Sequence, residues 1–538
     1  MGTLGHSASS SFVKSMTVEG TNVRQYKALT ASLNSAPYAW QRYSESQSQL
    51  LSFFARATYN YAERYVITAT YRLDGSSKFV GKNRWAQFPS FAAAWRISNE
   101  PWFRKVRFAI PAFTSAKLRL GWGTVGNQGI PSYQTTYRYS VTASATHEND
   151  YHKLMALSSL YLPSRGLKWE TTSQYNVGLD LDFFKGRLVL AADGYYKVTD
   201  DLLQTRVLAA SAGVYNPYVN MGSISNTGFE LTLNTVPVST RNWEWTIGGN
   251  FTLNRNKILS IDPSGAGTTE MYVYADQPKR KVEYFAGEKL SSSSINADYL
   301  NVFIKGEPMC LFYGLKTEGL IQEGETVDWV VSEEEKTDPK MAREAGAIKF
   351  VDVNGDGLIN TYDKVVIGDP NPDFTYGFNT SLRFRRISLS ASFVGSYGND
   401  VYNMQLANLS DMSTKSANRL RAPVFDCWTP ENKDSKWPAL SQAIKHTGDL
   451  NLCSDRFVED GSYLRLANAS ISYSVPFKRN SFIKHLSFAI SGKNLFCWTK
   501  YSGYDPDVNV FGRVQKYGID AGSYPSARTY MFDVKISF

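Results

Sequence analysis

The sequence predicts an all-β protein and, among all-β folds, favours a transmembrane antiparallel β-barrel. Three observations support this prediction: several segments alternate strictly between apolar and polar residues, short and long connections follow one another in turn, and an alternating segment ends the chain at Phe538. Strict alternation indicates a strand whose two faces meet different environments. In membrane barrels these environments are lipid outside and a polar lumen inside.

The composition of the chain argues against disorder, membrane-spanning helices and nucleic-acid binding. The chain has 538 residues, of which 43% are hydrophobic and 14% aromatic, a content that argues against disorder. No stretch approaches the roughly 18 uninterrupted apolar residues of a membrane-spanning helix. The formal charge of +9, with only 20% charged residues, is too small to indicate nucleic-acid binding. We therefore expect neither a helical membrane protein nor a nucleic-acid partner.

Six segments show the alternation most clearly, and we expect each of them to form a strand. They are 175–183, 243–254, 376–384, 387–393, 486–491 and 530–538. A soluble β-sandwich or propeller also produces alternation, because one face of its sheet is buried and the other solvated. Strand length favours the barrel: about 10 residues, tilted by about 40°, cover the roughly 25 Å of a lipid-facing band.

The lengths of the connections further favour a membrane barrel over a soluble β-sandwich or propeller. Short links are expected at 62–64, 184–187, 237–242, 385–386 and 476–482, with 98–115 as a longer member of this class. Long connections are expected at 125–167, 199–226, 257–372, 398–461 and 497–526. Outer-membrane barrels have short periplasmic turns and long extracellular loops in this alternation. The sequence therefore predicts about 14 strands, with all long loops on one side.

Several long phrases resemble the SusC/RagA family of TonB-linked outer-membrane proteins of Bacteroidetes. The clearest are YRLDGSSKFVGKNRWAQFPSFAAAWRISNEPWF at 71–103, LRLGWGTVGNQGI at 118–130, LKWETTSQYNVGLDLDFFKGRLVLAADGYYKVTDDLL at 167–203, NMGSISNTGFELTLN at 220–234, VDVNGDGLINTYDKVVIGDPNPDFTYGFN at 351–379 and VEDGSYLRLANASISYSVP at 458–476. The resemblance covers residues 53–538 and implies the C-terminal part of a plugged barrel of about 22 strands. Residues 1–52 are then expected to be a partial N-terminal barrel strand or loop segment, and 257–372 a long extracellular loop.

The resemblance also implies a function. Members of this family import large nutrients, oligosaccharides or peptides, across the bacterial outer membrane together with a SusD-like surface lipoprotein. The TonB complex supplies the energy, and outer-membrane lipid surrounds the barrel. With about 14 strands and no evident plug, TonB box or signal segment, we expect this chain to be a fragment whose TonB contact lies in the missing N-terminal part.

Two other classes of function stay open. The chain could be a surface glycan-binding or protein-binding protein, or a truncated barrel without active transport. It could also be a secreted polysaccharide-degrading enzyme, which would need a pair of catalytic carboxylates in a groove. The sequence has no phosphate loop, nucleophile elbow or H-E-x-x-H motif, and its four cysteines are isolated from one another. We therefore expect no enzyme and assign no catalytic or cofactor-binding residues.

One loop has the spacing of a calcium site, D-x-N-x-D-G-x-x-x-x-x-D over residues 352–363. Calcium prefers six or more oxygen ligands, which such loops supply from alternate positions and from position 12. The expected ligands are Asp352, Asn354, Asp356, Leu358 through its carbonyl, Asn360 and Asp363. Asp363 replaces the usual Glu, so the loop is closer to the dockerin type than to an EF-hand. The alternative is a polar loop of Asx turns without metal.

Aromatic residues in the long loops are candidates for stacking on sugar rings. They are Tyr215, Tyr218, Trp428, Trp498, Tyr501 and Tyr504. For any one of them, packing inside a loop or a place in the aromatic girdle at the membrane interface is the simpler interpretation.

Overall fold

The computed structural model describes residues 1–21, 38–144, 154–206, 216–261, 267–287, 299–332, 335, 337–338, 341–412, 418–446, 453–477, 482–508, 512 and 514–538. Two compact units are present. Unit 1 consists of Met1–Arg96, Arg119–Asn176 and Lys197–Ser223, and unit 2 of Ile97–Leu118, Val177–Tyr196 and Ile224–Phe538. Within the described ranges, no helix is long and apolar enough to cross a membrane.

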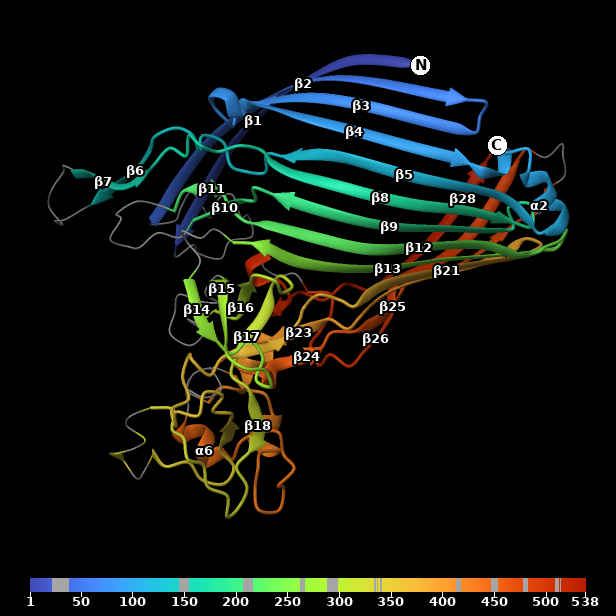
Figure 1. Cartoon of the computed structure of the whole chain (residues 1–538). Coiled ribbons are helices and arrows are strands. Elements are labelled where there is room, and N and C mark those ends of the chain that lie inside the picture. Colours follow the sequence, from blue (N-terminus) through green and yellow to red (C-terminus); the bar gives the residue numbers. More distant parts are fainter. Residues whose placement is uncertain are drawn as a thin grey trace. The chain divides into compact units, whose positions relative to one another are not determined.

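A 14-stranded sheet contains most of the regular structure (Figure 1). Its strands, in hydrogen-bonded order, are β1 (Gly2–Thr21), β2 (Tyr38–Tyr61), β3 (Tyr65–Ser76), β4 (Trp85–Arg96), β5 (Phe113–Asn127), β8 (Glu170–Phe183), β9 (Leu188–Asp200), β12 (Ser223–Ser239), β13 (Trp243–Ser260), β21 (Phe374–Phe384), β22 (Ile387–Tyr397), β25 (Tyr463–Ser474), β26 (His485–Thr499) and β28 (Thr529–Ser537). Chain order and sheet order agree throughout. The predicted antiparallel sheet of about 14 strands is confirmed.

Smaller elements lie in the connections. Five further sheets contain β6 (Arg138–Ser144) with β7 (Leu154–Tyr161); β10 (Leu203–Thr205) with β11 (Tyr218–Asn220); β14 (Gly267–Met271), β15 (Arg280–Ala286), β16 (Asn301–Ile304), β17 (Leu311–Gly314) and β20 (Val365–Gly368); β18 (Thr317–Leu320) with β19 (Ile348–Phe350); and β23 (Asp400–Asn403) with β24 (Val458–Asp460) and β27 (Ile519–Asp520). The helices are α2 (Phe103–Ala109), α4 (Met404–Ser410), α5 (Ala422–Phe425) and α6 (Leu440–Lys445), with 3-10 turns η1 (Gly81–Arg84), η2 (Ile97–Asn99), η6 (Asp455–Phe457) and η7 (Val514–Lys516).

The alternation of short and long connections is confirmed from β5 to β28, whereas on the N-terminal side the β3–β4 connection (77–84) is shorter than the β4–β5 connection (97–112). Three residues separate β2 from β3, and two separate β21 from β22, whereas the β13–β21 connection runs from 261 to 373. The backbone is left-handed at Ala62 (φ 50°), Phe184 (φ 53°) and Arg385 (φ 52°), the first residues of three of the short turns. Positive φ at the first turn residues matches the right-handed twist of the strands that such hairpins join. The short turns are therefore tight hairpins rather than flexible loops.

The large sheet has one apolar and one polar face because side chains alternate along each strand. In β13, β21 and β22 the cross-strand neighbours Trp245, Leu382 and Leu389 share one face. Large apolar side chains on this face stay exposed, and Ile490 in β26 retains 57% of its accessible surface. An exposed apolar face of this extent is stable in lipid rather than in water.

Aromatic pairs mark the short-turn ends of the strands. Ring centroids are 6.4 Å apart in the Tyr65–Trp95 pair of unit 1, and 4.2 Å apart in the Trp243–Phe384 pair of unit 2. Beside the C-terminus, the rings of Phe482 and Phe538 are 5.2 Å apart. Aromatic rings at strand ends are typical of the interface girdles of membrane barrels.

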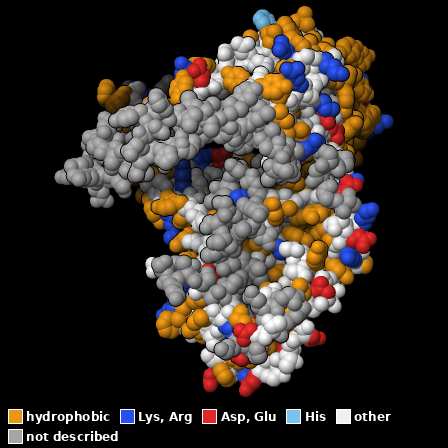
Figure 2. All heavy atoms as spheres, turned by 90° about the vertical axis from the view of Figure 1, so that its left-hand side faces the viewer, with side chains coloured by type: hydrophobic (Ala, Val, Ile, Leu, Met, Phe, Trp, Pro, Cys, Tyr) orange, Lys and Arg blue, Asp and Glu red, His pale blue; other side chains and the backbone are white. Residues whose placement is uncertain are grey.

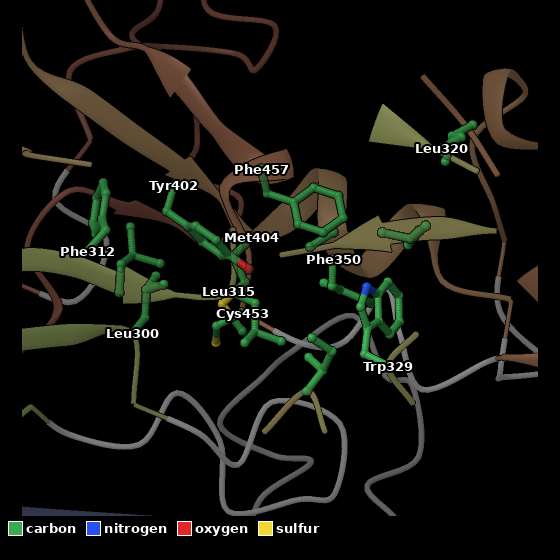
Figure 3. Close-up of a cluster of buried hydrophobic side chains, with 14 of the residues drawn as sticks. Leu300, Phe312, Leu315, Leu320, Trp329, Phe350, Tyr402, Met404, Cys453 and Phe457 are labelled. Atoms are coloured by element: carbon green, nitrogen blue, oxygen red, sulfur yellow. The ribbon is translucent and has the colours of Figure 1, made fainter. Parts of the chain in front are cut away.

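The largest hydrophobic core of the described residues lies in the long loops of unit 2 and not against the sheet (Figure 3). It draws residues from three connections that are far apart in sequence: Leu300, Phe312, Leu315, Leu320, Trp329, Ile348, Phe350, Ile359, Tyr402, Met404, Ala407, Trp428, Ala439, Cys453, Phe457 and Ile519. We call the described parts of residues 271–368, 400–460 and 501–527 the loop body. Because it has its own core, the loop body is a folded structure.

Candidate functional site in the long loops

Hydrogen bonds join the three connections of the loop body. β23 pairs antiparallel with β24 and parallel with β27, so that Tyr402 lies opposite Ile519. The Tyr501 hydroxyl donates to the buried carboxylate of Asp520 at 2.7 Å. Asp455 accepts hydrogen bonds from the N–H (3.1 Å) and hydroxyl (2.7 Å) of Thr317. These bonds hold the loops in one arrangement, which lowers the entropic cost of binding a partner.

The calcium-type loop folds around its own carboxylates. Asp352 accepts hydrogen bonds from the N–H groups of Gly355 (2.7 Å) and Gly357 (2.8 Å), and both glycines have positive φ. Asp363 is fully buried and accepts from the N–H groups of Val353 (3.1 Å) and Asn360 (2.8 Å). Burial, with a smaller contribution from the nearby Asp352 charge, raises the pKa of Asp363 above its ordinary value. A bound cation would offset the unfavourable burial of the ionised Asp363 carboxylate.

The remaining expected ligands lie in the same loop but are engaged in local bonds. The Asn354 and Asp356 side chains accept the N–H groups of Asp356 and Leu358, both at 2.8 Å. The Leu358 carbonyl accepts from the Asn360 side-chain amide at 3.0 Å. In the part of the chain that the structure describes, no three His, Cys, Asp or Glu side chains come together as a metal site. The donor types fit calcium, whereas metal binding itself stays a prediction.

The acidic content of this region is a feature that our sequence reasoning missed. Residues 315–363 contain 12 Asp and Glu against five Lys and Arg, within a chain of net charge +9. Acidic side chains are visible at the end of the loop body in Figure 2. Lys349 contacts Glu325 at 2.5 Å and Glu318 at 3.7 Å, and its hydrogen bond lowers the pKa of Glu325. A charge count over a sliding window would have found this segment.

Two half-buried carboxylates lie where the loop body joins the strands. Asp400 accepts the N–H of Asp369 at 2.8 Å, and Asp369 accepts the N–H of Asn371 at 2.8 Å. Partial burial raises the pKa of both carboxyl groups, and the Asp369 charge raises the pKa of Asp400 further. A polar cavity of about 170 Å³ lies beside Asp400 and Asp507. Since these carboxylates accept backbone hydrogen bonds that tie the segments together, they have the contacts of structural groups.

The six aromatic candidates differ in how far their rings are exposed. Trp428 and Tyr501 are buried, so their rings cannot stack on a sugar. Trp498 is 52% exposed and stacks on Phe496, with centroids 6.0 Å apart, at the loop end of β26. Tyr504 is 69% exposed, and Tyr218 lies in β11. Tyr215 lies outside the described residues. Of the loop body's candidates, Tyr504 alone presents an open ring.

Comparison with known proteins gives consistent results. A family model described as TonB dependent receptor-like, beta-barrel matches residues 3–301. The TonB-dependent receptor P26 of Formosa agariphila is 32% identical over 497 residues, which are 91% of this chain and 46% of that protein. SusC of Bacteroides thetaiotaomicron is 29% identical over 507 residues, 92% of this chain and 44% of that protein. The chain thus spans about half the length of these relatives.

Solved structures agree with the fold. The structure of the RagAB peptide transporter superposes with a TM-score of 0.73 at 21% identity, covering all of this chain and 53% of that chain. The family match begins at residue 3, whereas the sequence resemblance was placed from residue 53 onward. The additional residues of the family match include β1 and the first part of β2, which both belong to the large sheet.

Proposed function

Because the chain belongs to the TonB-dependent receptor-like β-barrel family, whose model matches residues 3–301, we propose that it takes part in TonB-dependent import of large nutrients. It is an outer-membrane protein, so the exposed apolar face of its sheet faces lipid. The proposed cargo is an oligosaccharide or a peptide, and the proposed partners are a SusD-like surface lipoprotein and the TonB complex. Energy coupling would need the part of the relatives' length that this chain does not span.

The folded loop body is the observation that supports recognition of a specific cargo or lid. Its core combines residues of three long connections, so its surface keeps a fixed shape. The same observation supports an alternative, surface binding without active transport, because a rigid loop surface can bind a glycan or protein by itself. The relatives are named receptors and transporters, and we propose no catalytic activity for the chain.

Uptake by cells distinguishes these functions. We expect cells that carry the gene to accumulate a labelled oligosaccharide or peptide, and accumulation to stop when the gene or the TonB complex is removed. Binding that persists without TonB, with no accumulation, would replace import with surface binding. Peptide mapping of the native product in outer membranes gives a second readout. A species well above 60.3 kDa with additional peptides would support the expected larger transporter.

We further propose that the loop 352–363 binds Ca²⁺ outside the cell, supported by its ligand spacing and by the buried Asp363. Elemental analysis of purified protein should then find about one calcium per chain, with a dissociation constant on the order of 0.1–1 mM. Asp352→Ala should lose this calcium, whereas Asp434→Asn, at an exposed acid elsewhere in the loop body, should keep it. No bound calcium at millimolar supply would refute the proposal.

A further inference from the structure

A groove of about 700 Å³ crosses the apolar face of the sheet in unit 2. Its floor is a row of small residues on adjacent strands, in which Ala391 of β22 lies opposite Ala469 of β25, and Ala469 opposite Gly492 of β26. The row continues to Thr380 of β21 on one side and to Tyr530 of β28 on the other. These small side chains leave the trough, and the Leu495 side chain lies over Gly492 and forms part of its wall.

Large apolar residues border the trough on both sides. The row nearer the short turns consists of Leu382, Leu389, Ile471, Ile490 and Phe532. The row nearer the loops consists of Phe378, Phe393, Leu466 and Phe496. Since cross-strand neighbours share a face, both rows project on the apolar side. The trough is therefore shaped by the residues of five adjacent strands.

The trough crosses the strands at different distances from their short-turn ends. Ala391 is four residues from the short-turn end of β22, whereas Gly492 is seven residues from the short-turn end of β26. At its far end, Tyr530 is the second residue of β28, directly below the loops. The trough therefore lies nearer the short turns on β22 than on β26 and β28, and it ends at Tyr530, an exposed residue of the type that is enriched at membrane interfaces.

Its dimensions fit a lipid chain. Five adjacent strands span about 19 Å at a spacing of about 4.8 Å. One leaflet contributes about 15 Å of the roughly 30 Å hydrocarbon core, so an inclined acyl chain has a comparable length. An unfilled apolar trough in the bilayer would forfeit dispersion contacts along its whole length. A chain lying in it would contact large apolar residues on both sides.

Charge at the outer end of the trough indicates the headgroup. Arg528 is exposed and directly precedes β28, two residues from Tyr530. Arginine binds phosphate through two parallel hydrogen bonds. We propose that the trough holds one acyl chain of an outer-leaflet lipid whose anionic, phosphate-bearing headgroup is bound by Arg528. This inference rests on the membrane location and does not depend on import.

Native mass spectrometry of protein purified from outer membranes tests the site. After delipidation, the protein is titrated with dimyristoyl phosphatidylglycerol or, as the zwitterionic comparison, dimyristoyl phosphatidylcholine. We expect one retained phosphatidylglycerol. Ala469→Leu fills the trough and should weaken retention of both lipids by about tenfold. Arg528→Gln should weaken retention of phosphatidylglycerol several-fold and leave phosphatidylcholine unchanged.

Two controls make the result decisive. Ala93 lies on the apolar face of β4, opposite Ile67 and outside the trough, so Ala93→Leu should retain lipid as the unmodified protein does. Ala391→Leu fills the trough at a second position if Ala469→Leu does not fold. Unchanged lipid retention in both trough-filling variants would overturn the proposal. If the trough-filling variants lose a dimer that the unmodified protein forms, and not a bound lipid, the trough is an interface between two copies.

Discussion

Replacing Phe457 by alanine is expected to lower the free energy of unfolding of the loop body by about 3–5 kcal/mol. Phe457 is 1% exposed and lies edge-on to Tyr402, with ring centroids 6.2 Å apart. Truncation removes a buried ring and leaves a cavity where three connections meet, so the cost of the cavity adds to that of the lost ring contacts. The loop body should therefore open at a lower denaturant concentration, while the strands in lipid keep their structure.

Limited proteolysis in a urea series measures this effect directly. Cleavage sites within 400–460 should appear at lower urea in Phe457→Ala than in the unmodified protein. Phe425, in α5, is 72% exposed and provides a matched control, because Phe425→Ala should change stability by no more than about 0.5 kcal/mol. Equal sensitivity of the two variants would show that the buried cluster does not stabilise the loop body.

The sheet could be predicted because its signal is local. Alternation within about ten residues specifies a strand with two unlike faces, and a two-residue link such as Arg385–Arg386 specifies a hairpin. The register then follows from the turns, so Leu382 and Leu389 pair without information from distant segments. The same locality explains why the spacing at 352–363 identified a compact loop.

The loop body could not be predicted because its contacts are long-range. Tyr402 pairs with Ile519 across more than a hundred residues, and no local pattern encodes that pairing. Trp428 illustrates the consequence: sequence reasoning placed it in a loop where it could stack on a sugar, but it is buried in a core shared with Phe350. Similarly, loop spacing identifies the types of metal ligand, but convergence of their oxygens depends on packing around Asp363.

Replacing Arg343 by methionine should destabilise the loop body by about 3–5 kcal/mol, because it leaves a buried carboxylate without its partner. The Arg343 and Glu335 side chains are 2% and 6% exposed and form a hydrogen-bonded pair at 2.9 Å, with His446 Nδ1 3.6 Å from Glu335. The Arg343 guanidinium also lies 5.5 Å from the centroid of the Trp329 ring. The pair between Lys305 and Glu283 is 45% and 36% exposed, so Lys305→Met should cost no more than about 1 kcal/mol.

The pH dependence separates loss of the charge partner from loss of packing. Burial by itself would raise the pKa of Glu335, but hydrogen bonds from Arg343 and from the Val331 N–H outweigh it and hold the pKa below the ordinary value of 4.5. The ionised pair therefore stabilises the native protein above that value and is lost as the pH falls below it. In Arg343→Met the hydrogen bonds from Arg343 are lost, so burial should raise the pKa of Glu335. The free energy of unfolding of this variant should therefore increase on going from pH 7 to pH 5.

Replacing Glu335 by glutamine in the same variant should restore most of the lost stability and abolish that pH dependence, because no unpaired charge stays buried. Urea midpoints of the loop-body cleavage at pH 5 and pH 7 measure both effects, and parallel pH profiles for the single and double variants would contradict the assignment.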